Sequence, residues 1–279
     1  IILILRLLKK KEDPKRFIEK IIFFKKAKIK GNLIWFHGAS VGEILSIIPV
    51  IKNYEKNKSI NQILITSSTL SSSKVLKKFK FKKTIHQFYP IDHILFTKKF
   101  LHYWKPDLAI FVESEIWPCM FKQLKKNKIS LILLNARLTK KTFNRWMLLK
   151  NFTMSTFNKI TVAYPQNIET KTFLKKLKIN KTNLIGNLKF AENDYDRLYS
   201  INDNLKSQFN KKKIWIASST HANEEIFCAK THIELKKKYK NLITIIIPRH
   251  VHRVKEIISQ INNLGLKAVS HSSNIKSLK

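Results

Sequence analysis

This chain of 279 residues is short of glycine, cysteine and acidic side chains. It contains five glycines, two cysteines, and 18 acidic residues against 55 basic ones. Cys119 and Cys228 lie far apart and lack the spacing of metal ligands, which argues against a disulfide framework or a zinc site and fits a reducing compartment. The apolar run that opens the chain is too short to span a bilayer.

The excess of positive charge, +37, suggests an anionic partner. Such a charge is typical of proteins that bind nucleic acid or an anionic membrane. Only seven of the basic residues are arginines, and the lysines are scattered among Ile, Asn and Phe, which share A/T-rich codons. A specific nucleic-acid surface concentrates its basic residues on one face. We therefore expect no specific nucleic-acid partner, and we keep a lysine-rich module for nucleic acid or anionic membrane as the alternative class.

Residues 1–29 form a basic, apolar segment at the start of the chain. Arg6 interrupts the apolar run, lysines follow it, and no small-residue cleavage site is present, so it does not resemble a signal peptide. The stub of a longer anchor, an interfacial helix with lysines at the headgroups, and an ordinary amphipathic helix all fit this pattern. We treat it as a membrane-proximal segment.

Short apolar strands then alternate with helix-length segments. This alternation predicts parallel sheets covered on both faces, in two domains at 30–189 and 213–279, joined by a polar linker at 190–212. The second domain is shorter than domains of this class usually are, so we expect it to be truncated. The predicted strands are 33–36, 62–66, 108–112, 131–134, 160–163 and 184–185, then 213–217, 242–247 and 266–269, with helices of the second domain from about Asn223 and His252.

Two of the five glycines, Gly38 and Gly42, lie in the stretch "WFHGASVGE". They flank the point where strand 33–36 turns into a helix predicted to begin near Val41. Ligands of parallel α/β sheets bind beyond the carboxyl ends of the strands, and glycine allows a tight turn and close approach of a substrate. The G-x-x-x-G spacing differs from the dinucleotide-binding fingerprint.

Glu43, in the same stretch, has two interpretations. Ser40 and Glu43 have the S-x-x-E spacing of a capping box, in which the glutamate bonds back to the backbone at the start of a helix. Its place at the end of a strand equally suits a catalytic carboxylate. The stretch by itself leaves both open.

The next strands also end in polar residues. Glu113 and Glu115 directly follow strand 108–112, and either could be a charge at a helix N-terminus. Asn135 and Arg137 end the following strand. The guanidinium of Arg137 suits a phosphate or carboxylate ligand, or a structural salt bridge to Glu113 or Glu115.

A third group of polar residues indicates an anion site. Hydroxyl and N–H groups before a helix, with basic residues at the end of the next strand, favour phosphate. His250 and His252 have the spacing of a metal pair, but no acidic or cysteine partner is near, so we expect no metal. The group comprises Gly186, Asn187, Lys189, Ser218, Ser219, Thr220, His221, Pro248, Arg249, His250, His252 and Arg253.

Six motifs, taken together, resemble the 3-deoxy-D-manno-octulosonic acid (Kdo) transferases. They are "HGASVGE", "ESEIWP", "NARLT", "GNLKF", "SSTH" and "PRH", in this order, and the resemblance runs from about Lys9 to the end of the chain. It implies an inverting GT-B glycosyltransferase with two Rossmann-like domains. The first would hold a lipid A precursor and the second CMP-Kdo, without a metal or other cofactor, at the cytoplasmic face of the inner membrane.

The resemblance also implies roles for residues. Glu43 would be the general base for the acceptor hydroxyl, and Glu113 and Glu115 a second acidic element. Arg249 would face the CMP phosphate with Ser219, Thr220 and Lys189. The other matched residues expected to bind substrate are Ser40, Gly42, Asn135, Arg137, Ser218, His221, Pro248 and His250.

The chain departs from the family pattern in two places. Val251-His252-Arg253 follows the PRH motif where the family usually has Pro-Glu-Arg, and the family's later Gly-rich loop and H-N-x-x-E segment lie beyond Lys279. We therefore expect no transfer by this chain alone, and another nucleotide sugar remains an alternative donor. The enzyme interpretation requires Glu43, Glu113 or Glu115, and Arg249 to line one interdomain cleft, whereas a binding module requires a continuous basic face.

Overall fold

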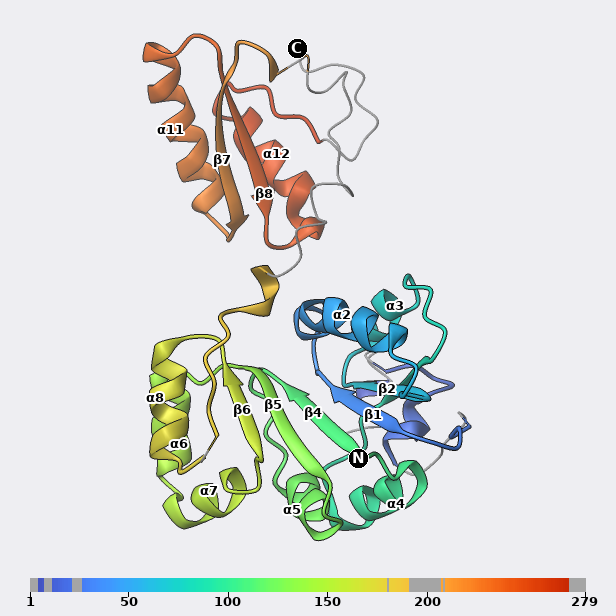
Figure 1. Cartoon of the computed structure of the whole chain (residues 1–279). Coiled ribbons are helices and arrows are strands. Elements are labelled where there is room, and N and C mark those ends of the chain that lie inside the picture. The colour runs from blue at the N-terminus through green and yellow to red at the C-terminus, as the bar shows by residue number, and fades with distance from the viewer. Residues whose placement is uncertain are drawn as a thin grey trace. The chain divides into compact units, whose positions relative to one another are not determined.

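The structure is a computed structural model that describes residues 5–7, 12–21, 27–179, 181–190, 207 and 209–270. The chain divides into two compact units, Ile1–Asn193 and Asp194–Lys279, and each unit is described by itself. Figure 1 shows the elements of both units.

The first unit is built on a six-stranded parallel sheet with helices between the strands. The strand order β3-β2-β1-β4-β5-β6 is the doubly wound Rossmann order. The strands are β1 Leu33–His37, β2 Gln62–Ser67, β3 Thr84–Phe88, β4 Leu108–Val112, β5 Ser130–Ala136 and β6 Val162–Pro165. The helices are η1 Phe17–Lys20, α2 Val41–Lys56, α3 Leu70–Leu76, α4 Ile94–Trp104, α5 Pro118–Lys126, α6 Lys140–Met147, α7 Lys150–Phe157, α8 Ile168–Lys176 and η2 Leu188–Phe190.

Both faces of this sheet are covered, which explains the continuous apolar sequence of its strands. Trp35 and Phe36, neighbours on β1, belong to two different core clusters. Phe36 packs in a cluster with Ile44 and Ile47 of α2, whereas Trp35 packs with Phe100 of α4. Figure 1 shows α2 and α3 on one side of the sheet and α4 and α5 on the other.

The direction of chain progression reverses between β1 and β4, which are neighbours in the sheet. The chain runs outward from β1 through β2 to β3, and then returns to β4 before it runs outward the other way. In open α/β sheets, ligands bind at this switch point, beyond the carboxyl ends of the strands. We therefore expect a ligand-binding site at the segments that follow His37 and Val112.

Part of the basic N-terminal segment packs on the first unit through buried ion pairs. Glu19 accepts hydrogen bonds from Arg16 at 2.7 Å (Nε) and 2.8 Å (Nη2), and from the backbone N of Phe88 at 2.9 Å. Lys20 lies 2.7 Å from the buried carboxylate of Glu12. Residues 12–21 therefore belong to the packed fold, and the predicted start of the domain at residue 30 misses them.

The second unit contains a two-stranded parallel sheet, β7 Lys213–Thr220 and β8 Leu242–Pro248. Its helices are α11 Glu224–Lys238, η3 Val251–Arg253 and α12 Val254–Asn262. The core of this unit is small. Among the described residues it consists of Ala229, Ile257 and Ile261, with a few partly buried apolar side chains packed against them. Ile214, Ile216 and Ile247 of the two strands are between 42% and 56% exposed.

Seven of the nine predicted strands are confirmed, β6 with a shift of two residues. Residues 184–185 do not form a strand, and an isolated bridge joins Ala163 to Thr182 instead. Residues 266–269 are not a strand either, and Leu266 packs against the small core of Ala229, Ile257 and Ile261. Most of the predicted linker at 190–212 lies outside the described residues.

Strand β3 was not predicted because polar residues interrupt its apolar pattern. Its two central polar side chains are paired within the fold: Gln87 accepts a hydrogen bond from Trp104 Nε1 at 3.1 Å, and His86 Nε2 lies 2.9 Å from Ser67 Oγ. Hydrogen bonding by these side chains replaces the apolar alternation on which the sequence pattern depends.

Candidate active site

The segment after β1 has the geometry of a capping box. Ser40 is the N-cap of α2, and its Oγ accepts the backbone N–H of Glu43 at 3.3 Å and donates to Glu43 Oε1 at 2.9 Å. Glu43 Oε2 accepts the backbone N–H of Ala39 at 2.7 Å. The capping interpretation of Glu43 is confirmed, and the same bonds fix the position of its carboxylate at the end of β1.

The environment of Glu43 also makes it a stronger base. Burial raises the pKa of its carboxyl group above the ordinary value, and the nearby charge of Glu115 raises it further, with a smaller contribution from Glu113. The hydrogen bonds from Ser40 and Ala39 act in the opposite direction without cancelling the rise. A carboxylate with a raised pKa is suited to general-base chemistry near neutral pH.

Space, and not backbone conformation, explains Gly38, whereas neither explains Gly42. Neither glycine has a positive φ angle. A Cβ atom at Gly38 would lie 3.2 Å from Glu43 Cβ and 3.3 Å from Ile44 Cδ1, which is tighter than ordinary contact. At Gly42 it would lie 3.8 Å from Lys189 Nζ, an ordinary distance. Gly38 thus allows the turn to pack against the first turn of α2.

Glu113 and Lys189 form an ion pair at the carboxyl edge of the same sheet. Lys189 Nζ lies 2.8 Å from Oε1 of the buried Glu113. Glu113 directly follows β4 with a φ of 55°, and its backbone N–H donates to Leu134 O on β5. The carboxylate of Glu113 is therefore already neutralised within the first unit.

Asn135 holds the segment that carries Lys189. Its buried side chain accepts the backbone N–H of Leu188 at 3.1 Å and donates to Asn187 Oδ1 at 3.4 Å. Arg137 is different, because it is exposed and its guanidinium has no ion pair or hydrogen bond among the described residues. The predicted alternative of a salt bridge from Arg137 to Glu113 or Glu115 is wrong, since Lys189 takes that place at Glu113.

Glu115 is held by two aromatic side chains. Its Oε2 lies 3.0 Å from His37 Nε2 and accepts the indole N–H of Trp117 at 2.8 Å. No role was predicted for His37 or Trp117 from the sequence. Both lie inside motifs that carry the family resemblance: His37 directly precedes Gly38, and Trp117 is two residues after Glu115. Their place in these motifs is the sequence feature that could have indicated a role.

The predicted anion-binding residues of the second unit lie at the carboxyl ends of β7 and β8. Ser219 has a φ of 62°, at a bulge between Ser218 and Thr220, and Arg249 N donates to Thr220 O at 2.9 Å. The pairing of Thr220 with Pro248 brings the ends of the two strands together. Exposed members of the group in this unit are Ser218, Ser219, His221, Arg249, His250 and His252.

Thr220 is buried and contributes to an ion pair below these exposed residues. Its hydroxyl donates to Glu225 Oε1 at 2.9 Å, and Arg253 Nη1 donates to the same oxygen at 3.0 Å. Although burial acts to raise it, the pKa of Glu225 is lowered overall by hydrogen bonds from its own backbone N–H, Arg253 and Thr220. Arg253 therefore stabilises the turn and has little freedom to bind a ligand.

The rings of His221, His250 and His252 lie close together in this unit. The centroids of His221 and His250 are 6.3 Å apart, and those of His250 and His252 are 5.6 Å apart. No group of three His, Cys, Asp or Glu side chains with metal-binding geometry is found in the described part of the chain.

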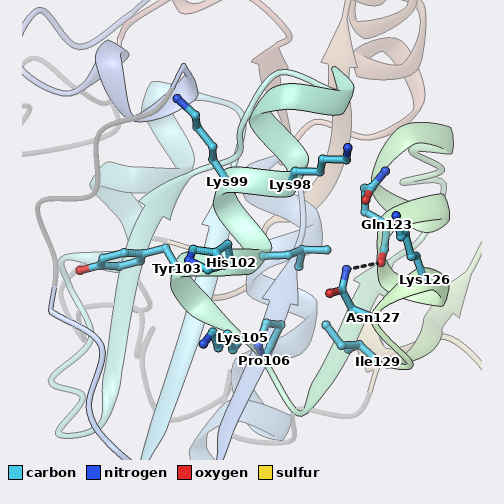
Figure 2. A pocket seen from close by; sticks show the side chains of 11 residues that line it. Lys98, Lys99, His102, Tyr103, Lys105, Pro106, Gln123, Lys126, Asn127 and Ile129 are labelled. Atoms are coloured by element: carbon cyan, nitrogen blue, oxygen red, sulfur yellow. Dashed lines mark hydrogen bonds between the residues drawn. The ribbon is translucent and has the colours of Figure 1, made fainter.

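An open groove of about 900 Å³ lies between α4 and α5 (Figure 2). It is at the end of the first sheet opposite to the one that carries Glu43. Pro106 and Ile129, which line it, lie two residues before β4 and one residue before β5, so the groove is at the amino ends of these strands. None of the predicted site residues lines it. A substrate there would be separated from Glu43 by the length of the sheet, and we do not regard the groove as the active site.

The strand order and the carboxylates at the switch point define a doubly wound α/β protein of the GT-B-like class. Two solved structures share this fold. UDP-GlcNAc 2-epimerase from Neisseria meningitidis, bound to UDP-GlcNAc, has a TM-score of 0.57 and 14% identity over 86% of this chain and 73% of that one. The S. aureus MnaA–UDP structure has a TM-score of 0.56 and 14% identity over 82% and 65%.

The family is shown by sequence comparison. Residues 15–192 match the family described as 3-Deoxy-D-manno-octulosonic-acid transferase (kdotransferase), and the chain belongs to this family. The 3-deoxy-D-manno-octulosonic acid transferase of Rickettsia bellii is 34% identical over 98% of this chain and 65% of that protein. The Haemophilus influenzae enzyme of the same name is 28% identical over 86% and 57%. The chain thus spans about half to two thirds of the length of these relatives.

Proposed function

We propose that this protein takes part in lipopolysaccharide synthesis by moving Kdo from CMP-Kdo to a lipid A precursor, with inversion at the anomeric carbon. The observation that carries the proposal is the fixed carboxylate of Glu43 at the switch point, where burial and the charge of Glu115 raise its pKa. Family membership supports the reaction class and disfavours a general lysine-rich binding module.

In this mechanism, Glu43 acts as the general base. It takes the proton of an acceptor sugar hydroxyl while the hydroxyl oxygen attacks the anomeric carbon of Kdo. The bond between that carbon and the phosphate oxygen breaks, and CMP leaves with the electron pair. A carboxylate has about four lone-pair positions, so Glu43 can bond to Ser40 and Ala39 and still accept this proton.

The second acidic element is Glu115 in this proposal, and Glu113 has a supporting role. Glu113 is paired with Lys189, whereas Glu115 is held by His37 and Trp117 and interacts electrostatically with Glu43. Asn135, Asn187 and Lys189 then shape the acceptor side.

On the donor side, the exposed residues at the ends of β7 and β8 would stabilise the phosphate of the leaving CMP. Ser219 and Arg249 are accessible for this contact, whereas the hydroxyl of Thr220 is engaged by Glu225. Cationic and N–H groups at a leaving phosphate stabilise the charge that develops in the transition state. No metal or other cofactor takes part in the proposed reaction.

We also propose peripheral attachment to the cytoplasmic face of the inner membrane. Leu148 and Leu149, between α6 and α7, are 83% and 66% exposed, and Phe152 is 49% exposed. Lys150 directly follows Leu149, and Arg145 lies three residues before Leu148. Apolar side chains beside cations are typical of surfaces that lie in the interface of an anionic bilayer. Among the described residues, no helix is both long and apolar enough to cross a membrane.

The experiment is a transfer assay with a lipid A precursor, using this chain joined to the C-terminal part of the Rickettsia bellii relative. We expect CMP-Kdo to increase the mass of the acceptor by one or more Kdo units, and UDP-GlcNAc to give no product. Transfer from UDP-GlcNAc in place of CMP-Kdo would identify a different donor and contradict the proposal.

A further inference from the structure

A buried histidine lies behind the carboxylates of the candidate active site. We infer that His37 is a positioning residue for transfer: it holds the Glu115 carboxylate in place through Nε2, beside the base Glu43. The inference rests on the proposed function and names a residue that acts through another, without touching the substrate itself.

The position of His37 is set by contacts on both ring nitrogens. His37 ends β1 and is completely buried. Nε2 lies 3.0 Å from Glu115 Oε2, while Nδ1 lies 3.0 Å from Thr66 Oγ1 and 3.2 Å from Thr66 O. The ring therefore joins β2 to the segment that follows β4, across the switch point of the sheet.

The partners decide which atom donates to Glu115. A carboxylate oxygen is an acceptor, and Oε2 already receives the indole N–H of Trp117, so the hydrogen between His37 and Glu115 belongs to Nε2. On the other side of the ring, Thr66 Oγ1 accepts the indole N–H of Trp35 at 2.8 Å and donates to Phe36 O at 3.4 Å, and Nδ1 has both Thr66 Oγ1 and Thr66 O within reach. This assignment follows from the hydrogen-bond network.

Aromatic packing keeps the His37 ring from turning. It stacks on Tyr89 with a centroid distance of 3.9 Å, and it meets Phe111 and Trp117 in T-shaped arrangements with centroid distances of 5.0 and 6.0 Å. A ring held in this way gives Glu115 a fixed donor with no loss of side-chain freedom when substrate binds. Pre-organisation of this kind is what a catalytic carboxylate requires of its supporting residues.

The arrangement leaves one side of Glu115 available. Both donors bind Oε2, and the side chain is 15% exposed. Oε1 is thus the oxygen that can face an acceptor hydroxyl or Glu43. Without His37, Trp117 alone would hold the carboxylate, which could then rotate about its last bond.

The test compares turnover in variants of this chain joined to the C-terminal part of the Rickettsia bellii relative, the protein used in the transfer assay. His37→Phe keeps a ring to stack on Tyr89 but loses the donor, and it should lower kcat about 10- to 100-fold with little change in KM, the range for a hydrogen bond to a charged group. His37→Gln can donate from a position close to Nε2 and should recover most of the rate. His37→Asn, with a shorter side chain, should not.

A double-mutant cycle separates positioning from a general loss of stability. If His37 acts through Glu115, the double variant His37→Phe/Glu115→Gln should be no slower than Glu115→Gln alone. The matched control is His232→Phe, which removes a partly buried histidine hydrogen bond to Thr244 in the second unit and should leave kcat unchanged. Thermal melting of each variant shows whether the fold is retained.

Two outcomes would overturn the inference. One is an unchanged kcat in His37→Phe and His37→Asn while Glu115→Gln is slow. The other is a double variant whose loss equals the product of the two single losses. Both leave the proposed function intact, which fails separately if Glu43→Gln retains full turnover or if no Kdo is transferred.

Nitrogen NMR of the 279-residue chain tests the hydrogen bond directly, because the chemical shift of His37 Nε2 can be measured without Kdo transfer. We expect the Nε2 resonance of His37 to move in Glu115→Gln and to stay in place in Glu234→Gln, an exposed carboxylate on α11. If the Nε2 resonance of His37 does not shift in Glu115→Gln, the hydrogen bond is absent, and this result would also overturn the inference.

Discussion

Lys189 and Glu113 form an ion pair, with 2.8 Å between Nζ and Oε1, that joins the short helix η2 to the end of β4. The two residues are 76 positions apart in the chain. The pair neutralises one of the two acidic residues of the "ESEIWP" motif, and it places a lysine beside Gly42, at the start of α2. It therefore distinguishes Glu113 from Glu115, which have the same sequence context.

Lys189→Met should show how much this ion pair contributes to the stability of the fold. Removal of the lysine leaves the Glu113 carboxylate without its partner, and because the lysine side chain is 43% exposed we expect a loss of stability of about 1 kcal/mol. The double variant Lys189→Met/Glu113→Gln should recover much of this loss, because it removes both charges. Chemical denaturation of all three proteins measures it. An equally unstable double variant would show that Lys189 acts through packing and not through Glu113.

Glu43→Gln should lower turnover roughly 10²- to 10⁴-fold, the usual contribution of a positioned base. Glutamine can still complete a capping box, so the melting temperature should hardly change. Kdo transfer and thermal melting are measured on the same preparations, with Ser40→Ala as a control that weakens the cap and keeps the carboxylate. A large loss of stability in Glu43→Gln with unchanged turnover would leave Glu43 only its capping role.

The pH dependence of transfer should report the charge of Glu115. A base must be deprotonated, so kcat/KM rises with pH through the pKa of Glu43, which burial and Glu115 place above the ordinary value of about 4.5. Glu115→Gln removes the negative charge, lowers the pKa of Glu43, and should move this acidic limb to lower pH. A limb that stays in place would show that Glu115 does not act on Glu43 by its charge.

The packed N-terminal residues should contribute to stability. Glu19→Ala removes the acceptor for Arg16 and for the backbone of Phe88, and we expect it to cost about 3 kcal/mol. Glu234→Ala breaks the exposed pair with Lys237 and should have almost no effect. Urea unfolding compares the two. For the same reason, a fragment of residues 12–190 should melt at a higher temperature than one of residues 30–190.

The exposed turn between α6 and α7 should contribute to membrane binding. Leu148→Ser/Leu149→Ser should weaken binding to vesicles that contain anionic lipid, because it removes two apolar side chains from the interface. Ile168→Ser, at a residue that is 72% exposed on α8, is the matched control. Sedimentation with vesicles at low and moderate salt measures the effect. Equal binding of both variants would place the membrane contact elsewhere, for example in the basic segment 1–29.

The sequence by itself determined the fold class and most of the elements. Continuous apolar strands separated by helix-length segments require a parallel sheet covered on both faces, and β1 with its two clusters is such a strand. The capping box of Ser40 and Glu43 was equally readable, because its bonds join residues three positions apart. Local spacing is sufficient where the interaction itself is local.

The tertiary structure decided which distant residues meet. The contact of His37 with Glu115, the pairing of Lys189 with Glu113, and the docking of Glu19 on β3 join residues 69 to 78 positions apart. The strand order brings these segments together, and no spacing along the chain encodes that order. For the same reason β3 was missed: the polar side chains that hide its pattern meet their partners Ser67 and Trp104 only after the chain has folded.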